Sequence, residues 1–369
     1  MGRFDGLRGP VTEHIEPPAR RMPAEWEPHD ATWIAWPHAT GDWPGRFGGI
    51  RWTYAEIVRR LAESERVEIL VEHPHQERSA RRTLRDAGVP LDPIRFHTIP
   101  TDRGWLRDSA PTFVHGGPGQ VGSVRRLIAL HWKFTAWAKY DNWRLDRSVP
   151  PRIGRAIGAT VLRPRYGRRW ISLEGGAFDV DGTGSVLATE ECLLSPEQAR
   201  NPGFTRSAYE TVFRRYLGAR RTIWIPRGIV GDDTHGHIDD IARFVGPGRV
   251  LLVRCDRAGD PDRAASEAAR SALESSRTLA GGRLAIEDLP CPQPVVIRGQ
   301  RLPASYANFY IANRTVLVPT FDDPADAEAL AVLQRAFPQR TVVGIRARDL
   351  VWGLGTIHCL TQQQPRSAP

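Results

Sequence analysis

Residues 223–254 read IWIPRGIVGDDTHGHIDDIARFVGPGRVLLVR, and this stretch contains the pattern on which the predicted fold rests. Two apolar runs of the kind found in β-strands flank the polar cluster GDDTHGHIDD at 231–240. The second run continues through the turn sequence GPG into RVLLVR, which predicts a β-hairpin. Two histidines and four aspartates at the mouth of a hairpin indicate a functional loop rather than an ordinary surface loop.

Two interpretations of this cluster are open. We expect the chain to be extended from His237 to Asp239, which places both side chains on one face because strand residues alternate. An acid or base then lies beside a carboxylate that binds cations. Alternatively, His235, His237 and Asp239 bind a metal ion, since the HxH spacing suits a metal on a strand. No further His/Cys cluster has obvious ligand spacing, which favours a site without a metal.

The hairpin is one of several similar units. Further hairpins are predicted at 111–124 (PTFVHGGPGQVGSV), 175–194 (GGAFDVDGTGSVLATEECLL) and 308–321 (NFYIANRTVLVPTF), and 29–37 (HDATWIAWP) is half of a fifth. Helix-then-strand patterns lie between them, at 53–72, 78–99, 153–164, 209–226, 263–290 and 327–345. A strand–strand–helix–strand unit that recurs about five times predicts a radial α/β array rather than a doubly wound sheet.

Polar groups lie at the mouths of these units. They are Trp105, Arg107 and Asp108; Glu174, Gly175 and Gly176; His237 and Asp239; and, after the last predicted strand, His358 and Cys359. If the units surround a common axis, all these mouths meet at one central cavity. Residues spread over much of the chain then form one site.

Several of these residues also have an ordinary structural explanation. Cys359, in GLGTIHCLTQQQ, fits a small buried hydrophobic residue, although its neighbouring glycines allow a ligand to approach closely. Glu174 fits a turn carboxylate, and Trp105 fits a core residue. Asp108 fits an ion pair with Arg107 or a helix N-cap.

The chain has 369 residues and no Pro/Ser-rich linker, so we expect one large domain over 22–364, an N-terminal arm (1–21) and a C-terminal tail (365–369). No run of 18 apolar residues predicts a transmembrane helix, and no apolar segment near the N-terminus predicts a secretory signal. Four cysteines without a CxxC pair suggest the reducing cytoplasm. We expect structural roles for three of them, Cys192, Cys255 and Cys291.

The net charge of +9 can indicate nucleic-acid binding. The positive residues are nearly all arginine, with lysine only at 133 and 139, and they are scattered rather than concentrated in one tail or face. We therefore expect neither nucleic acid nor a membrane as a partner. The chain also lacks the GxGxxG, GxxxxGKS and GxSxG motifs of nucleotide sites and serine hydrolases.

A thiol, an imidazole and several carboxylates suit a cationic substrate. A neutral acyl group fits poorly, because carboxylates repel the oxyanion that develops on it. A guanidinium is planar and positive, and it matches carboxylates in pairs. Its charge also favours the thiolate form of a nearby cysteine.

Over roughly residues 22–364, the chain resembles the agmatine deiminase / bacterial peptidylarginine deiminase family of guanidine-modifying enzymes. The resemblance rests on MPAEWEPHDATWIAWP, GWLRDSAPTFV, AWAKYDNWRLD, LEGGAFDVDG, DDTHGHIDDIARFV and GTIHCLTQQ, which occur in the family's order. It implies the pentein fold, a five-bladed α/β propeller with pseudo-fivefold ββαβ repeats around a central site.

The resemblance also implies roles for single residues. Cys359 matches the family's nucleophile, and His237 matches its general acid/base. Asp108 and Asp239 match the carboxylates that grip the guanidinium, and Glu174 matches the carboxylate that supports substrate and imidazole. The implied reaction converts agmatine to N-carbamoylputrescine and ammonia through a covalent thiouronium, without a metal or organic cofactor. The implied setting is polyamine metabolism, including putrescine biosynthesis.

Some positions depart from the family's usual pattern. Ala110 stands where Gly is common in RDxGP, and Leu354 and Thr356 replace parts of GGGNIHC. Trp105 is expected to contact substrate. Arg103 lies before it where many agmatine deiminases have a pair such as ND, and its charge would repel the distal ammonium of agmatine and favour a carboxylate.

We therefore expect a guanidino substrate, agmatine first and free or peptidyl arginine second. A metal-dependent hydrolase and a non-enzymatic basic binding protein on the same scaffold remain alternatives. A homodimer is one possible assembly.

Overall fold

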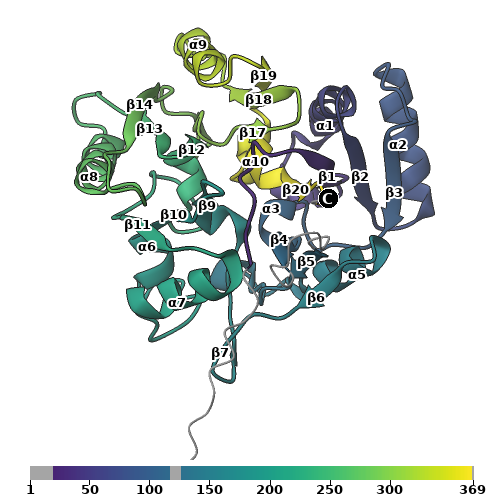
Figure 1. The fold of residues 1–369 in the computed structure, drawn as a ribbon. Coiled ribbons are helices and arrows are strands. Elements are labelled where there is room, and N and C mark those ends of the chain that lie inside the picture. The colour runs from purple at the N-terminus through teal and green to yellow at the C-terminus, as the bar shows by residue number, and fades with distance from the viewer. Residues whose placement is uncertain (1–19, 117–125, 368–369) are drawn as a thin grey trace, which may run out of the picture.

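The computed structural model describes residues 20–116 and 126–367. Five sheets share one strand pattern, in which two strands pair antiparallel and one of them pairs parallel with a third. At least one helix connects the parallel strands of each such pair. Figure 1 shows the five sheets arranged around the middle of the molecule, where the short helices α3 (Leu106–Ser109) and α10 (Ile357–Leu360) lie in contact.

The first sheet unites segments from opposite ends of the sequence. Its strands, in spatial order, are β20 (Thr361–Pro365), β1 (His29–Ala35), β2 (Arg66–Val71) and β3 (Ile94–Thr98). Its crossover helices are α1 (Phe47–Ala62) and α2 (Pro74–Asp86). Strand β20 runs antiparallel to β1, with Trp33 opposite Gln362.

The other four sheets have three strands each. In chain order, these are β4 (Thr112–Gly116), β5 (Arg126–Leu130) and β6 (Thr160–Leu162); β9 (Phe178–Val180), β10 (Ser185–Thr189) and β11 (Arg221–Ile225); β12 (Ala242–Gly246), β13 (Arg249–Arg254) and β14 (Ala285–Pro290); and β17 (Tyr310–Ile311), β18 (Thr315–Thr320) and β19 (Thr341–Arg346). Their helices are α4 (Arg144–Arg147), α5 (Val149–Ala156), α6 (Glu190–Leu194), α7 (Arg206–Leu217), α8 (Pro261–Ser275) and α9 (Asp326–Ala336).

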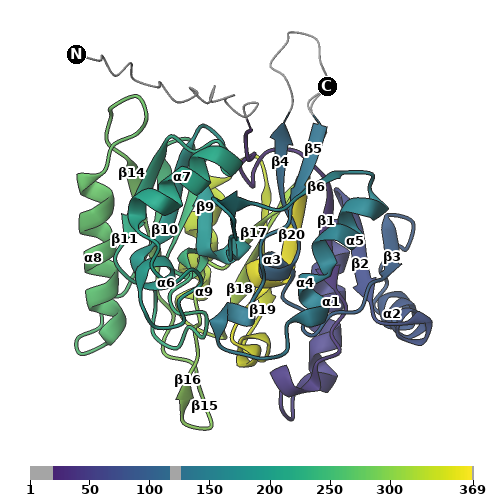
Figure 2. The same cartoon turned by 90° about the horizontal axis from the view of Figure 1, so that it is seen from below.

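Short elements fill the connections. They are the ribbons β7–β8 (Arg165–Tyr166, Arg169–Trp170) and β15–β16 (Val296–Ile297, Gln300–Arg301), and the 3-10 turns η1 (Thr40–Asp42), η2 (Ala136–Ala138), η3 (Gly175–Ala177), η4 (Ile238–Asp240) and η5 (Leu350–Gly353). Figure 2 shows the β15–β16 ribbon projecting from one end of the molecule.

The crossover helices have clear end signals in the sequence. Helix α7 begins after Thr205, whose hydroxyl accepts from the backbone N–H of Ala208, and ends at Gly218 with φ of 76°. Helix α8 begins after Asp260 with Pro261 in its first position. These caps fix the length of each helix between two strands.

The structure confirms the mixed α/β fold and corrects two local expectations. The strand predicted through 185–194 ends at Thr189, where the threonine hydroxyl caps α6 instead. The sequence pattern predicts no strand after Cys359, but TQQQP forms the buried strand β20, which includes the first residue of the expected C-terminal tail. Strand β5 begins at Arg126, whereas the predicted QVGSV lies outside the described residues, as does nearly all of the expected N-terminal arm.

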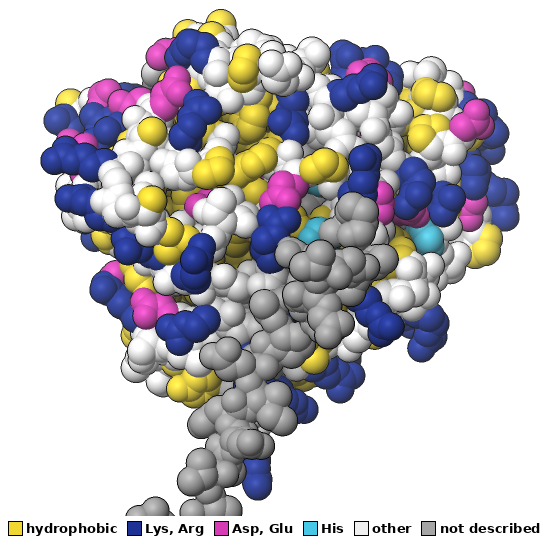
Figure 3. Space-filling view, in the orientation of Figure 1, with side chains coloured by type: hydrophobic (Ala, Val, Ile, Leu, Met, Phe, Trp, Pro, Cys, Tyr) yellow, Lys and Arg dark blue, Asp and Glu magenta, His cyan; other side chains and the backbone are white. Residues whose placement is uncertain are grey.

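Basic side chains do not concentrate in one patch on the face shown in Figure 3, where they alternate with acidic and neutral ones. Among the described residues, no helix is long and apolar enough to cross a membrane.

Candidate active site

The candidate site lies on short helical turns between strands. Asp108 belongs to α3, Glu174 precedes η3, Asp239 belongs to η4 and Cys359 belongs to α10. The prediction of an extended chain from His237 to Asp239 is wrong, because the backbone turns into η4 directly after His237. The turn still brings Nδ1 of His237 to 4.0 Å from Oδ1 of Asp239.

His237 is the centre of the cluster. Its Nδ1 lies 3.9 Å from Oδ2 of Asp108, and its Nε2 lies 3.7 Å from Oε2 of Glu174. The histidine is 1% exposed. Burial opposes its charged form, but Asp108 and the other acidic and thiol neighbours outweigh burial and raise its pKa well above the usual value.

Cys359 completes the group. Its Sγ accepts a hydrogen bond from Nδ2 of Asn308 at 3.1 Å and lies 3.8 Å from Oδ2 of Asp239. Burial raises the pKa of the thiol, and the negative charges of Asp239, Asp240 and Asp108 raise it further. In the absence of a cation, the protonated thiol is therefore the favoured form.

Asn308 holds the segment around the cysteine. Its Oδ1 accepts from the hydroxyl of Thr356 at 2.7 Å and from the backbone N–H groups of His358 and Cys359 at 3.1 and 3.3 Å. Its amide nitrogen also donates to Oδ1 of Asp240 at 3.0 Å. Sequence reasoning missed this residue, because one asparagine at the start of a predicted hairpin has no distinguishing pattern.

A buried arginine supports Glu174. The Nε of Arg200 donates to both carboxylate oxygens at 3.1 Å. Burial raises the pKa of Glu174, but the charge of Arg200 more than offsets burial and lowers it. The sequence signal for Arg200 was weak, because arginines are scattered through the whole chain.

Asp108 is held by hydrogen bonds and not by Arg107. Its Oδ2 accepts from Nε1 of Trp137 at 2.8 Å, and its Oδ1 accepts from the backbone N–H of Gly176 at 3.0 Å. Arg107 instead donates to Glu25 at 3.2 Å. The expected ion pair between Asp108 and Arg107 is therefore not the interaction that holds Asp108. Trp137 shows that the AWAKYDNWR run reaches the site.

Asp239 has a second histidine neighbour. Nδ1 of His358 lies 2.6 Å from Oδ2 of Asp239, and its Nε2 lies 2.8 Å from Oε2 of Glu25. Arg243 lies 3.1 Å from the other oxygen of Glu25. Oδ1 of Asp239 has no hydrogen-bond partner among the described residues, so one carboxylate oxygen beside His237 is left for a ligand.

Arg103 lines a cavity of about 610 Å³ together with Asp42, Tyr140, Gly353 and Leu354, whereas Trp105 is not among the residues that line it. The Trp105 ring packs so closely on Gly355 that a Cβ there would lie 2.8 Å from the ring and 3.1 Å from Cβ of Cys359. Nη1 of Arg103 donates to Oδ1 of Asp42 at 2.9 Å, and its guanidinium lies 4.2 Å from the centre of the Tyr140 ring.

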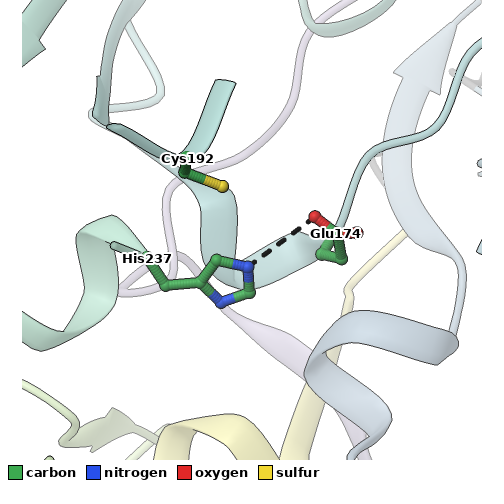
Figure 4. A group of neighbouring side chains, drawn as sticks. All are labelled: Glu174, Cys192 and His237. Atoms are coloured by element: carbon green, nitrogen blue, oxygen red, sulfur yellow. Dashed lines mark ion pairs between the residues drawn. The ribbon is translucent and has the colours of Figure 1, made fainter. Parts of the chain in front are cut away.

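The structure does not gather His235, His237 and Asp239 as a ligand set. Nε2 of His235 lies 3.1 Å from the Ser195 hydroxyl instead. In the part of the chain that the structure describes, the one group with metal-ligand spacing is Glu174, Cys192 and His237 (Figure 4). Cys192, expected to have a purely structural role, thus lies beside two of the predicted site residues.

Known proteins with similar sequences were found over nearly the whole chain. The model of the Porphyromonas-type peptidyl-arginine deiminase family matches residues 21–365. Agmatine deiminase from Ectopseudomonas mendocina (strain ymp) is 37% identical, with 93% of this chain and 95% of that protein covered. Agmatine deiminase from Pseudomonas aeruginosa (strain LESB58) is also 37% identical, with 94% and 95% covered.

The structures agree with the sequences. The solved agmatine deiminase of Enterococcus faecalis superposes with a TM-score of 0.84 at 29% identity, covering 96% of this chain and 99% of that one. The fold is thus the α/β fold of agmatine deiminases, as expected from the sequence. By the family model and by these relatives, the chain belongs to the Porphyromonas-type peptidyl-arginine deiminase family.

Proposed function

We propose that the protein is an agmatine deiminase, which hydrolyses the guanidinium of agmatine to a ureido group and releases ammonia. The observation that carries the proposal is the buried cluster of one thiol, one imidazole and three carboxylates around His237. Oδ1 of Asp239 is unpaired, and Oδ2 of Asp108 lies on the same side of the imidazole, near Nδ1, so the two carboxylates can bind a planar cation together. The agmatine deiminases among the relatives support agmatine as the substrate.

Substrate binding activates the nucleophile in this mechanism. The guanidinium brings a positive charge next to Cys359 and offsets the carboxylates that keep its thiol protonated. The thiol loses its proton to solvent as the cation binds, and the thiolate attacks the guanidinium carbon, so that a C–S bond forms while the C=N π pair moves onto nitrogen. His237, whose raised pKa keeps it protonated, gives its proton to the departing ammonia.

Water then completes the reaction. The neutral His237 takes a proton from a water molecule, whose oxygen attacks the thiouronium carbon. The C–S bond breaks with its electron pair on sulfur, the product oxygen gives its remaining proton to that thiolate, and the neutral ureido product leaves. One water is consumed and one ammonia is released in each cycle. Glu174, fixed by Arg200, lies 3.7 Å from Nε2 of the imidazole and favours the protonated form of His237.

Arginine, free or in a peptide, is the second candidate substrate. Arg103 favours arginine, because a guanidinium that lines this cavity attracts a carboxylate. The ion pair with Asp42 offsets most of the charge of Arg103, so agmatine remains the first candidate substrate.

The remaining expectations are part of this proposal. A single domain over 22–364 is consistent with five sheets that surround one site. The four cysteines are free, which suits a reducing cytoplasm. We also propose a homodimer as the assembly, which a size measurement in solution tests.

A ureido-product assay tests the function. Purified protein is offered agmatine, free arginine and a peptide with C-terminal arginine, with Cys359→Ala as the control. Turnover of agmatine that is lost in Cys359→Ala supports the proposal. If only arginine or the peptide is turned over, the substrate is arginine rather than agmatine. Absence of turnover with all three compounds contradicts the proposed function.

A further inference from the structure

Three possible metal-ligand atoms of different chemistry lie close together, and one of them belongs to His237. The Sγ of Cys192, a carboxylate oxygen of Glu174 and an imidazole nitrogen of His237 all lie within 4.8 Å of one another. Figure 4 shows the sulfur and the carboxylate directed towards the same side of the ring. All three residues are buried, and they come from three segments: the residue before η3, helix α6 and the residue before η4.

His237 is an unusual buried residue, because neither ring nitrogen has a hydrogen-bond partner among the described residues. Buried polar atoms are usually satisfied, and an exception calls for an explanation such as an ion or a ligand. The substrate side accounts for Nδ1, which faces Asp108 and Asp239. It does not account for Nε2, which faces Glu174 at 3.7 Å.

We propose that Glu174, Cys192 and His237 form a binding site for a thiophilic divalent cation, with Zn²⁺ as the best fit. Zinc takes sulfur, nitrogen and oxygen ligands in a tetrahedron, whose corners lie roughly 3.3–3.8 Å apart. The three donors already approach this spacing, and a water molecule supplies the fourth ligand. The site differs from the alternative expected from the sequence, since it includes neither His235 nor Asp239 as a ligand.

The charges around the cluster allow a cation there. The positive charge of Arg200 opposes cation binding, because its Nε already donates to both oxygens of Glu174. The carboxylates of Asp108 and Asp239 lie about 4 Å from the other side of the ring and favour it. A carboxylate oxygen has two lone pairs, so Glu174 can bind a metal while Arg200 orients it from behind.

Occupancy of this site is expected to stop turnover. A metal on Nε2 holds His237 neutral and fixes its ring, so His237 has no proton for the departing ammonia. This consequence rests on the proposed deiminase function, whereas metal binding itself does not. Zinc therefore acts as a reversible inhibitor and not as a cofactor.

The experiment titrates metal-free protein with Co²⁺, which gives a strong absorption band when a thiolate binds it, and then displaces it with Zn²⁺. Three variants, each lacking one thiol, are compared with wild type: Cys192→Ser, Cys359→Ala and Cys255→Ala. The Cys255 variant removes another buried thiol outside the cluster. We expect the band in wild type, Cys359→Ala and Cys255→Ala, and binding at least about 100-fold weaker in Cys192→Ser, the upper range for a lost metal-site contact.

The outcomes separate the two proposals. Binding to the inactive Cys359→Ala variant needs no turnover, so a band there supports the site whatever the enzyme's substrate is. A band that persists in Cys192→Ser but disappears in Cys359→Ala places the metal on the nucleophile and overturns the proposal, as does the absence of a band in folded wild type. Zinc inhibition that EDTA reverses in wild type, and that Cys192→Ser weakens by the same factor as binding, supports the expected consequence.

A second substitution guards against a folding defect. Cys192→Val fills nearly the same volume without a metal ligand, and its thermal unfolding is compared with that of Cys192→Ser. If both variants fold and both keep the band, the cysteine is not a ligand.

Discussion

The Nε atom of Arg200 lies 3.1 Å from both carboxylate oxygens of Glu174, and neither side chain is exposed to solvent. Arg200 also donates to the carbonyl oxygens of Gln198 at 3.0 Å and Thr234 at 2.5 Å. One guanidinium therefore joins the Glu174 turn, the segment after α6 and the loop that leads to His237. Stability and catalysis both depend on this pair.

Removing only the guanidinium should destabilise the protein. Arg200→Met leaves the buried carboxylate of Glu174 unpaired, which costs about 3–5 kcal/mol in the free energy of unfolding. Urea unfolding measures this change. The double variant Arg200→Met/Glu174→Gln should recover much of the loss, because no buried charge remains, while turnover stays low. A single variant as stable as wild type would contradict the argument.

Asn308 should affect the cysteine more than the fold around it. Asn308→Ala removes the N–H that donates to Sγ of Cys359, so the pKa of the thiol rises and kcat/KM falls by about 10–100-fold. Asn308→Asp keeps the acceptor oxygen but adds a negative charge, and the pKa should rise further. The rate of iodoacetamide alkylation as a function of pH reports the thiol directly. Equal alkylation profiles in all three proteins would speak against this role.

The charge of Asp239 should oppose the thiolate of the substrate-free protein. Its carboxylate is the first charge, after burial, that raises the pKa of Cys359. Asp239→Asn removes that charge, so the pKa falls and alkylation near neutral pH becomes faster. Deiminase turnover should fall in the same variant, because a carboxylate that binds the guanidinium is lost. Slower alkylation in Asp239→Asn would contradict the expected fall in the pKa of Cys359.

Gly176 sets the position of the imidazole. A Cβ at this residue would lie 2.5 Å from Nδ1 of His237 and 3.0 Å from Oδ1 of Asp108. Gly176→Ala should therefore displace His237 and lower kcat by about 100-fold, the cost of a misplacement on the order of 1 Å. Gly48→Ala in α1 is the matched control, because its new methyl group meets no atom within 4 Å. If the two variants have the same kcat, the close contact has no catalytic effect.

Arg103 should influence which substrate is preferred. Arg103→Asp removes a cation from the cavity that Arg103 lines and is expected to raise the ratio of kcat/KM for agmatine to that for arginine. The change should be up to about fivefold, because partly exposed charges contribute roughly 1 kcal/mol or less. Arg263→Asp makes the same charge change on α8, where Arg263 pairs with Glu267, and should leave the ratio unchanged. An unchanged ratio in Arg103→Asp would remove the argument for arginine.

The sequence was sufficient for the repeated units and for the residues at their mouths, since hairpin turns and helical spacing are local signals. It was insufficient for the backbone at His237, because a 3-10 turn of three residues has no periodicity to detect. Arg200 and Asn308 were missed for another reason. Their importance comes from contacts with Glu174 and Cys359, which lie 26 and 51 residues away and carry no local pattern.

Cys192 illustrates the same limit. Its surroundings in the sequence, EECLLS, resemble an ordinary apolar helix start, and it does form part of the short helix α6. Only the packing of α6 against the loop before η4 places its sulfur near His237. The lesson is that a residue can have a conventional local context and still belong to a site.

The pairing of β20 with β1 has a consequence for how the protein is made. Strand β1 ends at Ala35, and its antiparallel neighbour is not synthesised until residue 365, directly after Cys359. A chain synthesised only as far as β19 therefore exposes an unpaired edge on β1 and lacks Cys359, the proposed nucleophile. Synthesis of β20 pairs that edge and brings Cys359 to the centre in the same step, so we expect deiminase activity only once β20 is in place.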